Sequence, residues 1–136
     1  MGNMKWTNDQ LNAINHSADS SACVTAAAGS GKTALLIERV VTLIRGNEDE
    51  NIAAIPADKF AILTFTKNAA EEFRARMTLA IDKASRSGDG RIPREQFIKF
   101  RSSFIGTINS FCLGVLRDNT QLFDLPVNFS VVEEGR

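Results

Sequence analysis

Residues 26–33 read AAAGSGKT, in which a lysine and a hydroxyl residue directly follow a glycine. This spacing matches the phosphate-binding pattern G-x-x-x-x-G-K-[ST], except that Ala26 occupies the position of the first glycine. Gly29 and Gly31 permit backbone angles and a close approach that a side chain would block. Successive N–H groups can then point at phosphate oxygens. We call residues 26–33 the glycine loop and expect it to bind the phosphates of a nucleotide.

The last two residues of the glycine loop carry the expected chemistry. Lys32 would reach the β- and γ-phosphates, and the Thr33 hydroxyl would hold Mg²⁺. Both are therefore expected catalytic positions, and Thr33 is the expected metal ligand. The alternative is a tight strand-to-helix turn with a solvated lysine. The expected nucleotide contacts in the loop come from Ala26, Ala27, Ala28, Gly29, Ser30, Gly31, Lys32 and Thr33.

The elements on either side of the glycine loop favour phosphate binding. Residues 21–26 (SACVTA) are short and apolar, as in a buried strand. Residues 32–45 form a long apolar stretch that predicts a helix, and Gly46 is a suitable stop. Upstream, Thr7 followed three residues later by Gln10 is a capping box for a helix over residues 8–16.

Further strands and helices alternate along the rest of the chain. Strands are expected at residues 59–66, 103–106 and 128–132, the first of them buried on both faces. Helices are expected at residues 68–85, 93–100 and from residue 108 onward. This alternation predicts an α/β fold with a mostly parallel sheet flanked by helices.

Composition excludes several other classes of protein. The chain has 136 residues, 43% hydrophobic and 24% charged, with 16 basic and 16 acidic side chains, which suits one globular domain. Nine basic and five acidic residues between Lys67 and Arg101 give a local excess that could serve phosphate binding or be an ordinary solvated helix face. Without a membrane-length apolar run or signal peptide, we expect a cytoplasmic protein with no membrane partner. Cys23 and Cys112 are expected to be buried, reduced thiols.

Four segments in order resemble the N-terminal part of superfamily 1 DNA helicases of the UvrD/Rep type, most closely the AddA/RecB branch. They are WTNDQLNAI (Q motif), AAAGSGKT (P-loop), ILTFTKNAAEEFRARM (motif Ia) and FIGTINSFCLGVLR (motif Ib). The resemblance implies that residues 1–136 are the N-terminal part of helicase motor domain 1A, an incomplete RecA-like P-loop domain without the second motor domain. It also implies ATP and Mg²⁺ as cofactors, translocation on single-stranded DNA with duplex unwinding, and nuclease or helicase partner subunits.

The resemblance gives Gln10 a second role besides closing the capping box. In the family the Q-motif glutamine reads the adenine edge, which requires the donor and acceptor that an amide offers. Some relatives also stack an arginine on the base directly after GKT. Ala34 occupies that position here, so no stacking is expected from it.

Motifs Ia and Ib imply contacts to single-stranded DNA. Phe65 matches a position whose ring contacts a base, with Thr64 and Thr66 near the phosphates; the alternative for Phe65 is a core position. Thr107, Asn109 and Ser110 match polar positions near the DNA backbone, although the family usually has histidine at the position of Asn109. The alternative is a helix cap at Thr107 and a solvated Asn109.

Hydrolysis needs more than a phosphate-binding loop. In the family an Asp-Glu pair after a later strand and arginines from later motifs supply it. Residues 131–134 (VVEE) imitate such a strand, but the resemblance places them before that motif and the first acid should be aspartate. We therefore expect part of a longer helicase that binds ATP without efficient turnover. The alternatives are another P-loop enzyme, such as a nucleotide kinase, or a non-catalytic nucleotide- or DNA-binding module.

Overall fold

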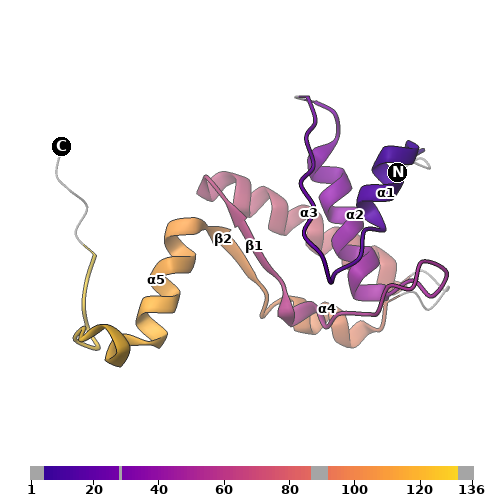
Figure 1. Ribbon diagram of the computed structural model, residues 1–136. Coiled ribbons are helices and arrows are strands. Elements are labelled where there is room, and N and C mark those ends of the chain that lie inside the picture. The colour runs from indigo at the N-terminus through magenta and orange to yellow at the C-terminus, as the bar shows by residue number, and fades with distance from the viewer. Residues whose placement is uncertain (1–4, 28, 87–91, 132–136) are drawn as a thin grey trace.

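The computed structural model describes residues 5–27, 29–86 and 92–131. It is an α/β structure in which helices surround a small parallel sheet (Figure 1). The elements in chain order are α1 (Asn8–Ile14), α2 (Lys32–Arg45), η1 (Ala57–Lys59), β1 (Ala61–Thr64), α3 (Lys67–Arg86), α4 (Arg94–Phe100), β2 (Phe104–Thr107), α5 (Ile108–Asp118) and η2 (Thr120–Phe123).

The two N-terminal helices begin and end close to where the sequence predicts. Thr7 caps α1 through the expected capping box, and α1 ends at Ile14, two residues before the predicted end. The predicted bounds of α2 are confirmed. Gly31 precedes it with a left-handed φ of 84°, and Gly46 follows it with a φ of 74°. Both conformations favour glycine, because a Cβ atom strains the backbone at positive φ.

The sheet consists of β1 and β2, which pair in parallel with Ile62 opposite Ile105 and Thr64 opposite Thr107. The crossover between them contains α3 and α4. The predicted strand at residues 103–106 is confirmed as β2, and the strand predicted at 59–66 is shorter. Parallel register places the carboxyl ends of both strands, and the loops that follow them, at one edge of the sheet.

The core lies on one face of this sheet. Ile62 and Ile105 face α3, and the fully buried side chains of Met77, Ile81 and Phe100 continue the core into α3 and α4. Leu63, on the opposite face of β1, is 45% exposed. The prediction that β1 is buried on both faces is therefore wrong, because no described helix covers the second face. Burying only one face gives a strand the period-2 pattern seen in β1.

Two other predicted strands are absent from the described residues. Residues 21–26 are extended but fully exposed, and residues 128–131 form no strand; Val132 lies outside the described residues. A strand needs a neighbour to pair its backbone N–H and C=O groups. In the described part of the chain, β1 and β2 pair only with each other. The same lack of cover explains why Cys23 and Cys112 are exposed, which corrects the prediction that they are buried.

Helix α5 projects from the body of the molecule and contacts mainly the two strands (Figure 1). None of its residues is buried, although its apolar side chains lie on one face. No described helix is long and apolar enough to cross a membrane.

Candidate functional site

The two glycines of the glycine loop adopt the backbone conformation that this loop requires. Gly29 has a φ of 75° and Gly31 a φ of 84°. A Cβ atom at either position would meet open space, so backbone conformation rather than crowding requires glycine here. Ser30 N donates to Ala27 O at 3.3 Å and closes the turn. Ala28, another predicted contact, lies outside the described residues.

The ammonium group of Lys32 folds back over the loop. Its Nζ donates to Ala26 O and Ala27 O, both at 2.7 Å. An ammonium has three hydrogens, so one remains for another acceptor. Both present partners are neutral carbonyls, and charge-assisted bonds to phosphate oxygens are roughly twice as strong. The lysine is therefore held at the loop and can exchange carbonyl acceptors for phosphate oxygens.

The first turn of α2 faces the same loop. Leu35 N donates to Gly31 O, whereas the preceding backbone N–H groups, at Lys32, Thr33 and Ala34, precede the first intrahelical bond. These groups and the helix dipole favour an anion at this end of a helix of 14 residues. The Thr33 side chain is exposed there. The loop and helix together form a cradle suited to phosphate.

No carboxylate of the described residues bonds to Lys32 or Thr33, and those residues contain no cluster of three or more metal-ligating side chains. Glu133 and Glu134 lie outside the described residues. A metal at the cradle would therefore rely on the Thr33 hydroxyl and on phosphate oxygens.

Gln10 forms the local contacts of the capping box. Its Oε1 accepts from Thr7 N at 2.9 Å, and its own N–H donates to Thr7 Oγ1 at 3.3 Å. The capping interpretation is thus confirmed. A carbonyl oxygen has two lone pairs, and the amide nitrogen has two hydrogens, so Gln10 retains both an acceptor and donors for an adenine edge. Its contact with adenine stays a prediction.

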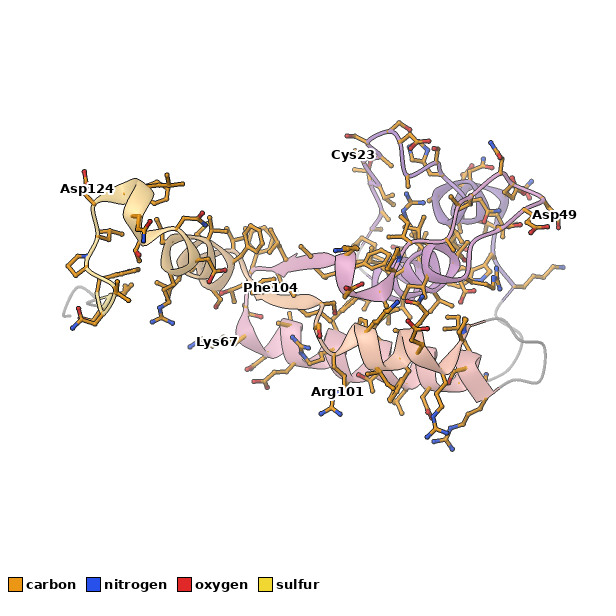
Figure 2. The ribbon with its side chains drawn as sticks, turned by 90° about the horizontal axis from the view of Figure 1, so that it is seen from below. Cys23, Asp49, Lys67, Arg101, Phe104 and Asp124 are labelled. Atoms are coloured by element: carbon orange, nitrogen blue, oxygen red, sulfur yellow. The ribbon has the colours of Figure 1, made fainter. Side chains whose placement is uncertain are left out.

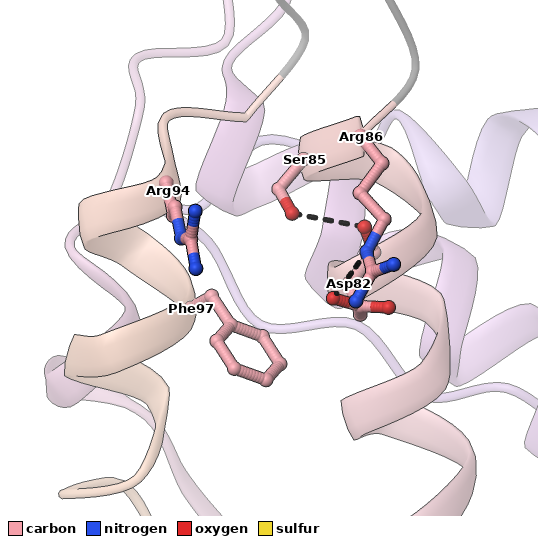
Figure 3. Close-up of a pocket in the computed structure, with 5 residues that line it drawn as sticks. All are labelled: Asp82, Ser85, Arg86, Arg94 and Phe97. Atoms are coloured by element: carbon pink, nitrogen blue, oxygen red, sulfur yellow. Dashed lines mark hydrogen bonds and ion pairs between the residues drawn. The ribbon is translucent and has the colours of Figure 1, made fainter.

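A cavity of about 260 Å³ lies between the two N-terminal helices, beside the glycine loop. It is lined by Ala13, Ala22, Val24, Lys32, Leu35, Leu36 and Arg39. A second cavity, of about 500 Å³, lies between the end of α3 and the start of α4 (Figure 3). None of the predicted site residues lines the second cavity, and the Ser85 hydroxyl and Arg86 guanidinium there both bond to Asp82.

The predicted DNA-binding residues gather at the carboxyl ends of the two strands. We call Thr64, Phe65, Thr66, Thr107, Asn109 and Ser110 the strand-end cluster. Register places Thr64 directly opposite Thr107, so motifs Ia and Ib meet there. Phe65 follows β1 and is 93% exposed. The alternative that Phe65 is a core residue is therefore wrong. An exposed aromatic ring at a strand end can stack on a base.

Most hydroxyls of the strand-end cluster also have structural bonds. Thr64 Oγ1 donates to Thr66 O at 2.9 Å, and Thr66 Oγ1 accepts from Ala69 N at 3.2 Å at the start of α3. Thr107 Oγ1 accepts from Ser110 N at 3.2 Å, which confirms the predicted cap of α5. Asn109 is exposed, as its alternative interpretation predicts.

The local excess of basic residues is partly neutralised. Three pairs spaced four residues apart on a helix join Arg76 to Glu72, Arg86 to Asp82 and Lys99 to Glu95. The hydrogen bond from Glu95 raises the pKa of Lys99. These exposed pairs favour the interpretation of a solvated helix face over that of a strongly basic patch. Figure 2 shows Lys67 near the strand ends and Arg101 on the α4 side.

Two arginines have structural roles that the sequence did not reveal. Arg74 Nη2 donates to Ile105 O at 3.0 Å and joins α3 to β2. Arg39 Nη1 donates to backbone carbonyls at the end of α1. Neither arginine belongs to a motif with a known spacing, because each contact joins elements distant in sequence. The acceptors are main-chain carbonyls, which every residue carries, so residue type gives no signal.

Comparisons with known proteins agree with the site. The family model described as UvrD/REP helicase N-terminal domain matches residues 6–136. Over 135 residues, or 98% of its length, the chain is 39% identical to the A-type subunit of the ATP-dependent helicase/nuclease of Clostridium botulinum (strain Alaska E43 / Type E3). It is 38% identical to the protein of the same name from Clostridioides difficile (strain 630), also over 98% of its length. The match covers 10% of each of these relatives, so the chain spans about a tenth of their length.

Proposed function

The chain belongs to the UvrD/REP helicase N-terminal domain family, and we propose that it is the nucleotide-binding part of an ATP-dependent DNA helicase. In this proposal residues 1–136 are the N-terminal part of a RecA-like motor domain 1A within a longer protein. That protein couples ATP hydrolysis to translocation on single-stranded DNA and to duplex unwinding. The relatives are named as one subunit of a helicase/nuclease, which supports nuclease or helicase partner subunits for this protein.

The observation that carries the proposal is the cradle at the start of α2. Two left-handed glycines, free N–H groups of the first helical turn and the Lys32 ammonium converge on one exposed place. A nucleoside triphosphate with Mg²⁺ suits this arrangement, since it offers phosphate oxygens to the donors and a metal to the Thr33 hydroxyl.

The strand-end cluster supports the DNA half of the proposal. Phe65 offers a stacking surface, and Asn109 offers an amide donor at the start of α5. In Figure 1 the glycine loop stands apart from these strand ends, so nucleotide and DNA would occupy separate places. Separate sites are what a motor needs if nucleotide state is to control its grip on DNA.

Gln10→Ala tests which nucleotide the cradle takes. We expect the variant to bind ATP roughly two- to tenfold more weakly, the equivalent of one hydrogen bond, and GTP unchanged. Calorimetric titrations with Mg·ATP and Mg·GTP measure both.

Thr7→Ala is the matched control, because it breaks the same capping box and keeps the Gln10 amide. An equal loss for both nucleotides, reproduced by Thr7→Ala, would assign Gln10 to capping alone. A wild-type chain that binds neither nucleotide would contradict the proposed function itself.

Phe65→Ala tests the DNA contact. Single-stranded DNA binding should be weak and fall as salt rises, because one domain supplies few phosphate contacts. The variant should lose about 1–3 kcal/mol of binding free energy, by an amount that salt changes little, because stacking is not ionic. Fluorescence anisotropy with a labelled oligothymidylate at several salt concentrations measures it.

Phe123→Ala is the control for this variant, since Phe123 is a half-exposed ring on η2, outside the strand-end cluster. Equal affinities for Phe65→Ala and Phe123→Ala would remove Phe65 from the DNA site. Thermal unfolding should be nearly unchanged in Phe65→Ala, because the ring is almost fully exposed.

A further inference from the structure

Arg39 joins the two helices that carry the proposed nucleotide contacts. It lies within α2, and its Nη1 donates to Ala13 O at 3.1 Å, Ile14 O at 3.1 Å and His16 O at 2.8 Å. These carbonyls lie at the C-terminal end of α1, where a helix leaves its last carbonyl groups without intrahelical partners. A guanidinium there satisfies them and places a positive charge at the negative end of the helix.

Helix α1 has little else to hold it. It contains seven residues, its last turn has no basic side chain of its own, and Ile14 is its single buried residue. A helix of this length is unstable in water without tertiary contacts. Its contacts in the described structure are mainly with α2. The position of α1 therefore depends on Ile14 packing and on Arg39.

Arg39 is itself half-buried, and this burial lowers its pKa. Losing water around a guanidinium costs free energy that good hydrogen bonds must offset. The three carbonyl bonds provide that compensation. Removing the side chain would leave those acceptors at the end of α1 without their donor and open the cavity that Arg39 lines with Ala13 and Lys32.

The geometry links base recognition to phosphate binding. Gln10 lies on α1, whereas Lys32 and Thr33 open α2. Arg39 is about two helical turns beyond Lys32 on α2. One nucleotide can reach Gln10 and Lys32 together only if the two helices keep a fixed relation. The contact that fixes this relation is the one between Arg39 and the end of α1.

We propose that Arg39 is a positioning residue that holds the base-reading helix α1 against the phosphate-binding helix α2, and so sets the preference for adenine without touching the nucleotide. This inference rests on the proposed function, because it presumes that Gln10 and Lys32 bind one nucleotide. It assigns the selectivity for the base to a residue outside every motif of the chain.

Arg39→Ala and Arg39→Lys test the inference through the ratio of ATP to GTP affinity. Mg·tripolyphosphate serves as a ligand without a base. For Arg39→Ala we expect the affinity ratio to fall by the same two- to tenfold as for Gln10→Ala, with tripolyphosphate affinity unchanged. Arg39→Lys should restore part of the ratio, because an ammonium can also donate to the carbonyls. Adding Gln10→Ala to Arg39→Ala should produce no further loss, since both act on one contact.

Hydrogen exchange gives a readout that needs no nucleotide. Backbone exchange in α1 should accelerate in Arg39→Ala while exchange in α3 stays unchanged, which also shows that the variant is folded. An unchanged affinity ratio, unchanged exchange in α1, or equal losses for ATP, GTP and tripolyphosphate would each overturn the inference. A wild-type chain that binds none of the three ligands would overturn the proposed function, and a wild-type chain that binds ATP and GTP equally would overturn the inference alone.

Discussion

The 136-residue chain is expected to bind Mg·ATP but to hydrolyse it slowly, with or without single-stranded DNA. Lys32 and Thr33 can position phosphates and a metal. Yet no described carboxylate bonds to either residue, and we expect the transition-state arginines to come from elsewhere in a motor. An arginine of that kind alone is worth about 10³–10⁵ in rate. Missing carboxylates should compound the loss, although such losses do not simply add.

A phosphate-release assay on the purified chain, with and without an oligonucleotide, measures this rate. Lys32→Ala separates true turnover from a contaminating ATPase, because a contaminant is indifferent to the variant. DNA-stimulated release that Lys32→Ala abolishes would contradict the prediction. Glu133 and Glu134, which lie outside the described residues, would then be the first carboxylates to replace. The expected result is release at the same low level in both proteins.

Local signals in the sequence predicted the helices well. The capping box at Thr7 and Gln10, and the glycines on either side of α2, placed helix ends within two residues. Caps and left-handed glycines act over a single turn, so a sequence window contains all the information that they need.

Strands were harder to predict, since their stability depends on distant neighbours. Residues 21–26 and 128–131 have the composition of strands but no partner among the described residues. Leu63 has the apolar character of a core residue, yet it lies on the uncovered face of β1. Apolar composition predicts burial only where another element is present to cover the side chain.

The site shows the same division between local and distant information. The glycine loop and the exposure of Phe65 agree with expectations from short motifs. Arg39 could not be predicted, because its partners are backbone carbonyls more than twenty residues away. The structural bonds of Thr66 were also missed, although a threonine directly before a helix is a recognisable cap signal.

Replacing Lys32 should have the largest effect on nucleotide affinity. Lys32→Ala removes the ammonium that the loop carbonyls hold at the cradle, and phosphate then loses its main side-chain partner. A hydrogen bond to a charged group contributes about 1.5–3 kcal/mol, so ATP affinity should fall about 10- to 100-fold. Stability should change little, since the Lys32 side chain is exposed. Lys59→Ala, which replaces another exposed lysine outside the glycine loop, should bind ATP as the wild type does.

Paired calorimetric titrations of the wild-type chain and Lys32→Ala with Mg·ATP test most directly whether the glycine loop binds nucleotide. We predict measurable binding by the wild type, an affinity about 10- to 100-fold weaker for the variant, and matching thermal unfolding curves that show both proteins to be folded. Equal ATP affinity in the two proteins, or no binding by the wild type, would contradict the assignment of residues 26–33 as the nucleotide site.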